Sequence, residues 1–286
     1  MHNQRVKIGV VIADLGSDDT KRALEYLILS MNTIQNSFDF QLVQTDKSNF
    51  ITALSDGNKV SRNYIEESAQ EFLNELKNKE EKKCTQYNLE YSKKINIVIL
   101  STAKFKDDYF QTGGDSWSLI ALGNWKETMS PPSILEFFIS MLIRTSIDKA
   151  CQKNQPKRHF RSKGCCFDFC SKIEDARYFV LTGYLCDVCT KNIETETNKL
   201  LVTETKFLLS KTWLGTTLDP SNISLVTKKL GHDLFHTMGV QPKPWDRVKD
   251  LIFSEFCKQT TKLVFNSIPI IVNLILALVI LSKCNA

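Results

Sequence analysis

The stretch VKIGVVIADLGSDDTKRALEYLILSMNTIQNSFDFQLV, residues 6–43, decides the fold class. Its first part, residues 6–13, is apolar and rich in β-branched side chains, which favours a buried strand over a helix. Residues 18–36 then repeat apolar side chains at helical spacing, behind two aspartates that can cap a helix. Residues 38–43 alternate between apolar and polar side chains and predict a second strand. A strand, a helix and a strand in succession predict an α/β sheet.

Similar patterns continue outward from this stretch. Gly113 and Gly114 are turn residues, and we expect them to form the turn that leads into a strand at the edge of a mixed sheet. The proline pair before residue 134 is well placed to open a helix, because residues of a first turn need no N–H. The elements expected after residue 43 are a polar helix at 62–83, a buried strand at 95–101, the edge strand at 117–122, and helices at 134–150, 194–209 and 222–237.

Composition and charge are those of an ordinary globular protein. The chain has 286 residues, of which 42% are hydrophobic and 24% charged, and its formal net charge is +5. A basic run at Lys157, Arg158, Arg161 and Lys163 lies beside a group of cysteines. No extended basic patch interleaved with aromatic side chains accompanies it, so we interpret the run as a solvated loop and expect no nucleic-acid partner.

The C-terminal segment predicts a membrane anchor. Residues 263–282 hold no formal charge over 20 residues, the length that a helix needs to cross a lipid bilayer. Residues 246–262 have the spacing of an amphipathic helix and carry most of the flanking basic residues, which places the large domain in the cytoplasm. The N-terminus is polar, and we expect no signal peptide. Asn273 lies inside the predicted span, where it either hydrogen-bonds a second copy, giving a homo-oligomer, or is a tolerated polar residue.

A cysteine-rich segment at residues 159–189 predicts a metal site. The sequence contains nine cysteines, and in a cytoplasmic domain clustered cysteines are more often metal ligands than disulfides. Cys186 and Cys189 form a CxxC, a spacing that lets two thiolates reach one tetrahedral Zn²⁺. Four protein ligands would close such a site and make the zinc structural. The expected ligands are Cys166, Cys170, Cys186 and Cys189, with Cys165 and His159 as alternatives for the upstream positions.

This segment resembles the C-terminal part of archaemetzincins, a family of zinc metallopeptidases. In that family a cysteine, one residue and a methionine are followed by 17 residues and a CxxC. Here Cys166, Phe167 and Asp168 are followed by 17 residues and then by Cys186 and Cys189. The resemblance covers roughly residues 94–193, because the order of the preceding strands and of the long helix is also similar. It implies a metzincin-like α/β fold with a mixed sheet.

The chain departs from the family at the catalytic helix. Metzincins carry HExxHxxGxxH there, in which two histidines bind zinc and the glutamate activates water. Glu136 matches that glutamate, but Leu135 and Ile139 stand at the histidine positions, and alkyl side chains cannot bind a metal. Asp168 replaces the methionine below the active site. The resemblance therefore implies a degenerate metzincin, a pseudo-enzyme that keeps the structural zinc and lacks the catalytic one.

A second histidine pair gives the alternative interpretation. His232 and His236 are four residues apart, and with Asp233 and Gly239 they imitate HExxHxxG, with aspartate in place of glutamate. An active zinc metallopeptidase could use His232, Asp233 and His236, with His159 as a further ligand. The competing interpretation is a helix over residues 222–237 that Gly239 ends.

The function expected from these patterns is that of a membrane-anchored, non-catalytic, metzincin-like zinc-binding protein. Its partners would be the lipid bilayer and a protein or peptide that binds along the edge strand near Trp117, or further copies of the chain in the membrane. The expected segments are an α/β domain at 1–193 that contains the zinc segment at 159–189, a helical extension at 194–245, an amphipathic juxtamembrane helix at 246–262, and a transmembrane helix at 263–282.

Overall fold

A computed structural model describes most of the first 234 residues of the chain. The chain divides into two compact units, residues 1–239 and 240–286, and all described residues belong to the first. The described ranges are 5–46, 48–55, 57–89, 95–123, 132–151, 156–160, 164–171, 173–216, 218–219 and 222–234.

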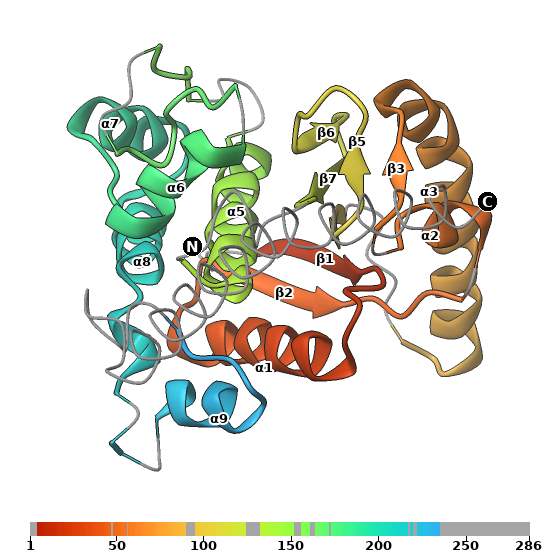
Figure 1. Ribbon diagram of the computed structural model, residues 1–286, viewed down its shortest axis with the longest axis horizontal. Helices are drawn as coiled ribbons and strands as arrows, with labels where there is room; N and C mark the ends of the chain where they lie inside the picture. Colours follow the sequence, from red (N-terminus) through yellow and green to blue (C-terminus); the bar gives the residue numbers. More distant parts are fainter. Residues whose placement is uncertain are drawn as a thin grey trace, which may run out of the picture. The chain divides into compact units, whose positions relative to one another are not determined.

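A five-stranded mixed sheet forms the centre of the first unit (Figure 1). Its strand order is β2-β1-β4-β7-β6, and every neighbouring pair is parallel except β6 with β7. The register pairs Val10 with Leu42 on β2 and with Val98 on β4. The strands are β1 (Val6–Ile12), β2 (Phe38–Leu42), β4 (Asn96–Ser101), β6 (Gln111–Gly113) and β7 (Trp117–Ala121), and a separate parallel pair joins β3 (Lys59–Val60) to β5 (Lys104–Phe105).

The prediction that residues 117–122 form the edge strand is wrong. β7 lies between β4 and β6, and all five of its residues are buried. The edge strands are β2 and β6, and β6 turns back onto β7 through a tight hairpin in which the Gly114 amide donates to the Trp117 carbonyl at 3.1 Å. A Cβ on Gly113 would lie only 2.6 Å from that carbonyl oxygen, so the hairpin needs glycine there. Gly113 is therefore part of the edge strand itself.

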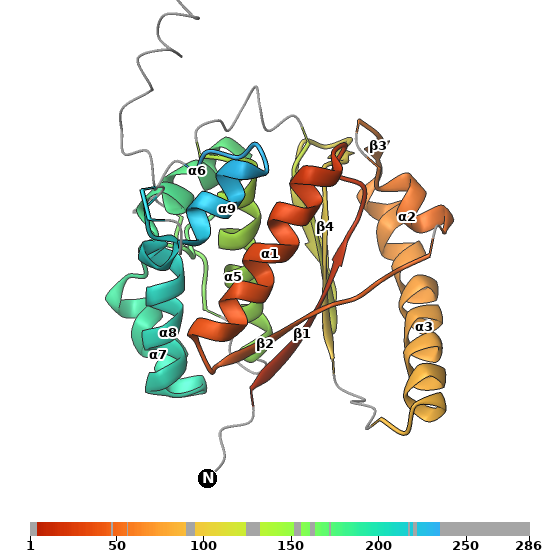
Figure 2. The ribbon, with the colours of Figure 1, turned by 90° about the horizontal axis from the view of Figure 1, so that it is seen from below.

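Helices cover both faces of the sheet (Figure 2). One face carries α1 (Asp18–Ile34) and α5 (Ile134–Ala150), and the other carries α2 (Asn49–Ala53) and α3 (Arg62–Gln86). Alternation along β1 explains the two cores: Ile8 and Val10 pack toward α1 and α5, whereas Val11 packs toward α3. The strands and helices predicted over residues 6–43, 62–83, 95–101 and 134–150 are confirmed, with ends that differ by a few residues.

α5 is buried around its whole circumference from Ile134 to Lys149. The sheet covers one side, and α6, α7 and α8 lie beyond it on the side away from the sheet (Figures 1 and 2). Its buried charges are paired or hydrogen-bonded: Lys149 donates to the carbonyls of Gly114 and Trp117 at 2.6 and 3.0 Å. The remaining helices are α6 (Ile173–Thr182), α7 (Asp187–Glu196), α8 (Lys199–Ser210), the 3-10 turn η1 (Thr212–Leu214) and α9 (Ile223–Lys229).

Two predicted helices have other limits. The helix expected over 194–209 is divided between α7 and α8, because the Asn198 side chain accepts from the Leu201 amide at 2.9 Å and starts a new helix. The helix expected over 222–237 ends at Lys229, followed by Gly231 at φ +84°. α8 also packs into the same apolar core as α5, and its Glu204 accepts the Asn36 amide at 3.0 Å, just before β2.

No helix within the described part of the chain combines the length and apolar character needed to cross a membrane. The predicted amphipathic helix at 246–262 and the predicted transmembrane helix at 263–282, with Asn273, lie outside the described residues. Both stay predictions.

Candidate metal centre

Four side chains from the cysteine-rich segment converge on one point. They are His159, Cys165, Cys186 and Cys189, whose ligand atoms all lie within 4.8 Å of one another. The His159 Nε2 atom is 3.2 Å from each of the Cys186 and Cys189 sulfurs. A tetrahedral zinc ion has nitrogen–sulfur edges of about 3.6 Å and sulfur–sulfur edges of about 3.8 Å. The donor set and the spacing therefore fit one tetrahedral ion.

The CxxC is placed by the start of a helix. Cys186 is the N-cap of α7 and Cys189 lies in its first turn, so both sulfurs are near the amide end of that helix. The Cys186 carbonyl accepts from the Thr190 amide at 2.8 Å, which fixes the turn. The start of this helix therefore places the two sulfurs side by side, as one metal ion requires of a CxxC.

His159 and Cys165 are held by two short parallel bridges. His159 pairs with Asp168: its amide donates to Phe167 O at 3.0 Å, and its carbonyl accepts from Phe169 N at 2.7 Å. Cys165 pairs with Tyr184, which directly precedes Leu185 and the CxxC. Backbone hydrogen bonds, which need no metal, thus align the segment of His159 and Cys165 with the residues that precede the CxxC.

Hydrogen bonds set the ionisation of the sulfurs. The Cys189 thiol donates to Cys165, and the backbone amides of Cys186 and Phe167 also donate to it, which together lower the pKa of Cys165 to about 5 against the effect of burial. The Cys186 amide lies 3.4 Å from the Cys165 sulfur. The pKa of Cys189 is raised, because its protonated thiol donates a hydrogen bond to Cys165, because it is buried, and because negative sulfurs lie around it. A divalent cation would remove that repulsion and stabilise all three thiolates.

Cys166 and Cys170, which were expected as ligands, lie outside this group. Cys166 lies in the turn that follows Cys165, and although both side chains are fully buried in the same core, only the Cys165 sulfur converges with the CxxC. Burial raises the pKa of Cys166 to about 12 and keeps it a neutral thiol. The Cys170 sulfur lies 3.8 Å from the Arg144 guanidinium, on the side facing α5. The two alternatives, Cys165 and His159, are the residues that converge with the CxxC.

Charged residues fasten this segment to α5. The Asp168 carboxylate accepts the Cys165 amide at 3.1 Å, and Arg144 of α5 donates to the Asp168 carbonyl at 3.3 Å. Arg158, from the basic run, forms a 2.5 Å ion pair with Asp148 of α5 and stacks over the Phe167 ring at 4.9 Å. These contacts orient the backbone on both sides of the ligands, as outer-shell groups do around structural metals.

α5 is the helix that the resemblance matches to the catalytic helix, and neither of its residues at the two histidine positions can bind a metal. Leu135 and Ile139 are fully buried apolar side chains. Glu136 is 1% exposed and forms a capping box with Ser133: its carboxylate accepts the Ser133 amide at 3.0 Å, and its own amide donates to the Ser133 hydroxyl at 3.2 Å. Glu136 therefore stabilises the start of α5.

His232, the first residue of the second histidine pair, does not lie on a helix. His232 follows the end of α9, and its amide donates to the Thr227 carbonyl at 2.9 Å. Burial lowers the pKa of His232, with Asp19 of α1 acting in the opposite direction. Asp233 is half-buried beside it, while His236 lies outside the described residues.

Comparison with protein-family models and with curated proteins finds no match. Among solved structures, the fold is similar to the archaemetzincin of Methanopyrus kandleri, with a TM-score of 0.41 and 11% sequence identity. The similarity covers 68% of this chain and 97% of that one. The solved structure belongs to the family named from the cysteine segment; the likeness is modest, and no residue role is carried across it.

The sequence interpretation missed the roles of Asp168 and Arg144. Asp168 was noted only as a substitute for a family methionine, although its position three residues after Cys165 suits a side chain that accepts that residue's amide. Arg144 carried a weaker signal: it is a charged residue in the middle of a largely apolar helix, which predicts a buried partner without identifying it.

Proposed function

We propose that this chain is a zinc-binding protein in which one structural Zn²⁺ is held by His159, Cys165, Cys186 and Cys189. The observation that carries the proposal is the convergence of these four ligand atoms within 4.8 Å. Three thiolates and one imidazole are a donor set that zinc favours over magnesium and calcium, which prefer oxygen.

A structural role follows from the number of ligands. Four protein ligands complete a tetrahedron and leave no position for water or substrate. The three cysteines are buried, and the described residues between α5 and α6, which include two of the ligands, form no helix and only isolated β-bridges. Zinc would therefore contribute to folding by joining that loop to the start of α7.

The α/β domain is proposed to be non-catalytic and to act through interactions. In support, Leu135 and Ile139 offer no metal ligand and Glu136 is used as a helix cap. β6 is the last strand of the sheet, and an edge strand can bind an extended peptide by adding it as a further strand. A protein or peptide partner at Gln111–Gly113 is thus part of the proposal, in place of the one expected at Trp117.

Attachment to a membrane, with the α/β domain in the cytoplasm, is proposed from the sequence of residues 263–282 and from the basic residues that precede it. Association of copies through Asn273 belongs to the same proposal. The test is alkaline carbonate extraction of membranes from cells that make the full chain. Resistant protein is expected, and substitution of Leu276→Arg with Val279→Arg should release it, because each charge opposes insertion. Wild-type protein in the supernatant would refute the anchor.

The test of the zinc site is metal content per chain, measured by mass spectrometry on the full-length protein in detergent. Wild-type protein should hold one zinc, and Cys186→Ser should lose it. Cys84→Ser, at a half-buried cysteine of α3 remote from the site, is the matched control and should keep it. The His232→Ala, His236→Ala variant should also keep one zinc. A second zinc that is lost with those histidines would support the alternative function, an active zinc metallopeptidase.

A further inference from the structure

The outer side of β2 is one of the two edges of the sheet. In a parallel pair, alternate residues of a strand direct their main-chain groups toward the neighbouring strand. The Val43 amide donates to the Val10 carbonyl of β1 at 2.9 Å, so Phe38, Phe40 and Leu42 direct theirs outward. Outward groups that lack partners make an edge strand a template for pairing with another chain.

Two side-chain amides of the α1 segment occupy these outward groups. Asn32 binds both main-chain groups of Phe40: its Nδ2 atom donates to the carbonyl at 2.7 Å, and its Oδ1 atom accepts from the amide at 2.9 Å. Gln35 binds Phe38 in the same way, with distances of 2.8 and 2.7 Å. Each side chain therefore makes the donor and acceptor contacts that a neighbouring strand would make.

The connection that leads into β2 is held as well. The Glu204 carboxylate of α8 accepts the Asn36 amide at 3.0 Å and the Ser37 hydroxyl. The Ser37 carbonyl accepts from the Val6 amide of β1 at 2.8 Å. Side chains from α1 and α8 thus cover this edge over residues 36–40.

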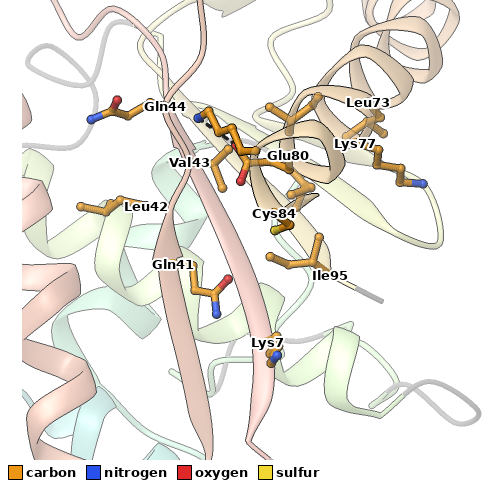
Figure 3. Close-up of a pocket in the computed structure, with 13 residues that line it drawn as sticks. Lys7, Gln41, Leu42, Val43, Gln44, Leu73, Lys77, Glu80, Cys84 and Ile95 are labelled. Atoms are coloured by element: carbon orange, nitrogen blue, oxygen red, sulfur yellow. Dashed lines mark hydrogen bonds and ion pairs between the residues drawn. The ribbon is translucent and has the colours of Figure 1, made fainter. Parts of the chain in front are cut away.

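The covered part of the edge ends at Phe40. Leu42 is the next outward residue, and Gln44 follows after Val43, whose amide still bonds β1. Among the described residues, none has a hydrogen bond to the outward main-chain groups of Leu42 or Gln44. A cavity of about 340 Å³ separates this end of β2 from the C-terminal half of α3 (Figure 3). The helix therefore leaves this end of the strand accessible.

Asn32 limits the length of the accessible stretch. With Asn32 in place, only residues 42–44 are open, which is at the lower limit of strand length. Without it, residues 40–44 would be open and would have the usual strand length of about five residues. One side chain thus decides whether this edge is long enough to pair.

The other edge differs. Phe110 and Gly114 bond β7 through their main-chain groups, so the alternate residues Gln111 and Gly113 of β6 direct theirs outward. In the described part of the chain, no side chain binds those groups as Asn32 binds Phe40. β6 is thus the open edge of this sheet, and β2 is the closed one.

We propose that Asn32 and Gln35 prevent β2 from pairing with β2 of a second copy of this chain. Two copies related by a two-fold axis would bring their β2 strands together antiparallel, each with the same outward groups. Such pairing is separate from the association through Asn273 proposed above. It depends neither on the zinc site nor on a peptide at β6.

The first test uses the unaltered full-length protein in detergent. Hydrogen–deuterium exchange, followed by mass spectrometry with fragmentation to single residues, compares the outward amides of the two edges. The amides of Phe38 and Phe40 should exchange roughly tenfold or more slowly than those of Gln111 and Gly113, because side chains accept them. Equal exchange at the two edges would overturn the proposal, whatever a variant does.

The second test opens the edge. Asn32→Ala should roughly double the protein mass per particle relative to wild type, as light scattering measures at equal protein and detergent concentrations, because copies pair as a symmetric dimer. Thr33→Ala, at the next and exposed position of α1, is the matched control and should keep the wild-type mass.

A proline then shows whether the new contact is strand pairing. Gln44→Pro, added to Asn32→Ala, should restore the wild-type mass, because proline has no N–H to give to a neighbouring strand. A folded Asn32→Ala variant with the mass of wild type would overturn the proposal. A larger mass that Gln44→Pro leaves unchanged would also overturn it, since association would then occur by another route.

Discussion

The guanidinium of Arg144 donates a hydrogen bond to the carbonyl oxygen of Asp168, 24 residues later in the chain, at a distance of 3.3 Å. The same Asp168 accepts the amide of the proposed ligand Cys165 through its carboxylate. Arg144 also lies over the ring of Phe179, at 5.2 Å from its centre. One buried side chain of α5 therefore positions both the loop that carries two ligands and the helix α6 that follows it.

Replacing that side chain should weaken the whole segment. Arg144→Met keeps the packing volume but leaves the Asp168 carbonyl without this donor, so we expect a loss of about 2–4 kcal/mol in the free energy of unfolding. Zinc should also leave faster to a colorimetric chelator. Arg22→Met removes an exposed ion pair on α1 and should change stability by less than about 0.5 kcal/mol. Equal denaturation curves for the two variants would argue against the role of Arg144.

Adjacent cysteines should respond oppositely to substitution. Cys165→Ser should lose the bound zinc, because its sulfur is one of the four converging atoms. Cys166→Ala should keep one zinc per chain and lose about 1 kcal/mol of stability, since it removes a buried sulfur from the core. Metal analysis of the two purified variants checks this. Zinc loss in Cys166→Ala, with Cys165→Ser unaffected, would restore the ligand set first expected from the sequence.

The start of α5 should depend on its capping box. Ser133→Ala removes the hydroxyl that accepts the Glu136 amide, and we expect a loss of about 1 kcal/mol in thermal or chemical denaturation. Ser133→Asp provides another acceptor and should retain most of the stability. Neither change should alter zinc content. A loss of zinc in Ser133→Ala alone would mean that this end of α5 takes part in the metal site.

Two glycines with positive φ separate backbone strain from steric overlap. A Cβ on Gly183, at φ +56°, would collide with the carbonyl group of Leu209, whereas a Cβ on Gly231, at φ +84°, would meet nothing within 4 Å. Gly231→Ala should cost about 1 kcal/mol, the usual strain of this conformation. Gly183→Ala should cost clearly more, about 3 kcal/mol or above, because α8 must also move away from the end of α6. Similar unfolding midpoints would show that α8 is free to shift.

The first half of the fold was predictable because its sequence patterns are strong and local. Residues 6–13 read as a buried strand, and the stripe of α1 has a clear helical period, so β1, α1 and β2 were placed correctly. The edge of the sheet was not, because β6 is three residues long and contains a glycine. A strand of that length has no periodicity to detect, and its pairing depends on the hairpin with β7.

The group of four converging side chains could be predicted only in part. The CxxC spacing identifies Cys186 and Cys189 locally, since both belong to one helical turn. The choice between Cys165 and Cys166 depends on the bridge of Cys165 with Tyr184, which a one-residue shift would reverse. That register is fixed by contacts with α5, such as the pair of Arg158 with Asp148, which are distant in sequence.

The order of the elements along the chain has a consequence for synthesis. The last strand of the described sheet ends at Ala121, and the first of the four converging residues is His159, so all five strands of that sheet leave the ribosome before any proposed ligand does. Domains generally begin to fold from the N-terminus as they are made, at about 5–20 residues per second. We therefore expect metal capture to be a late event in the maturation of this protein, acting on a nascent sheet that has already paired, and metal starvation to trap a collapsed intermediate rather than an unfolded chain.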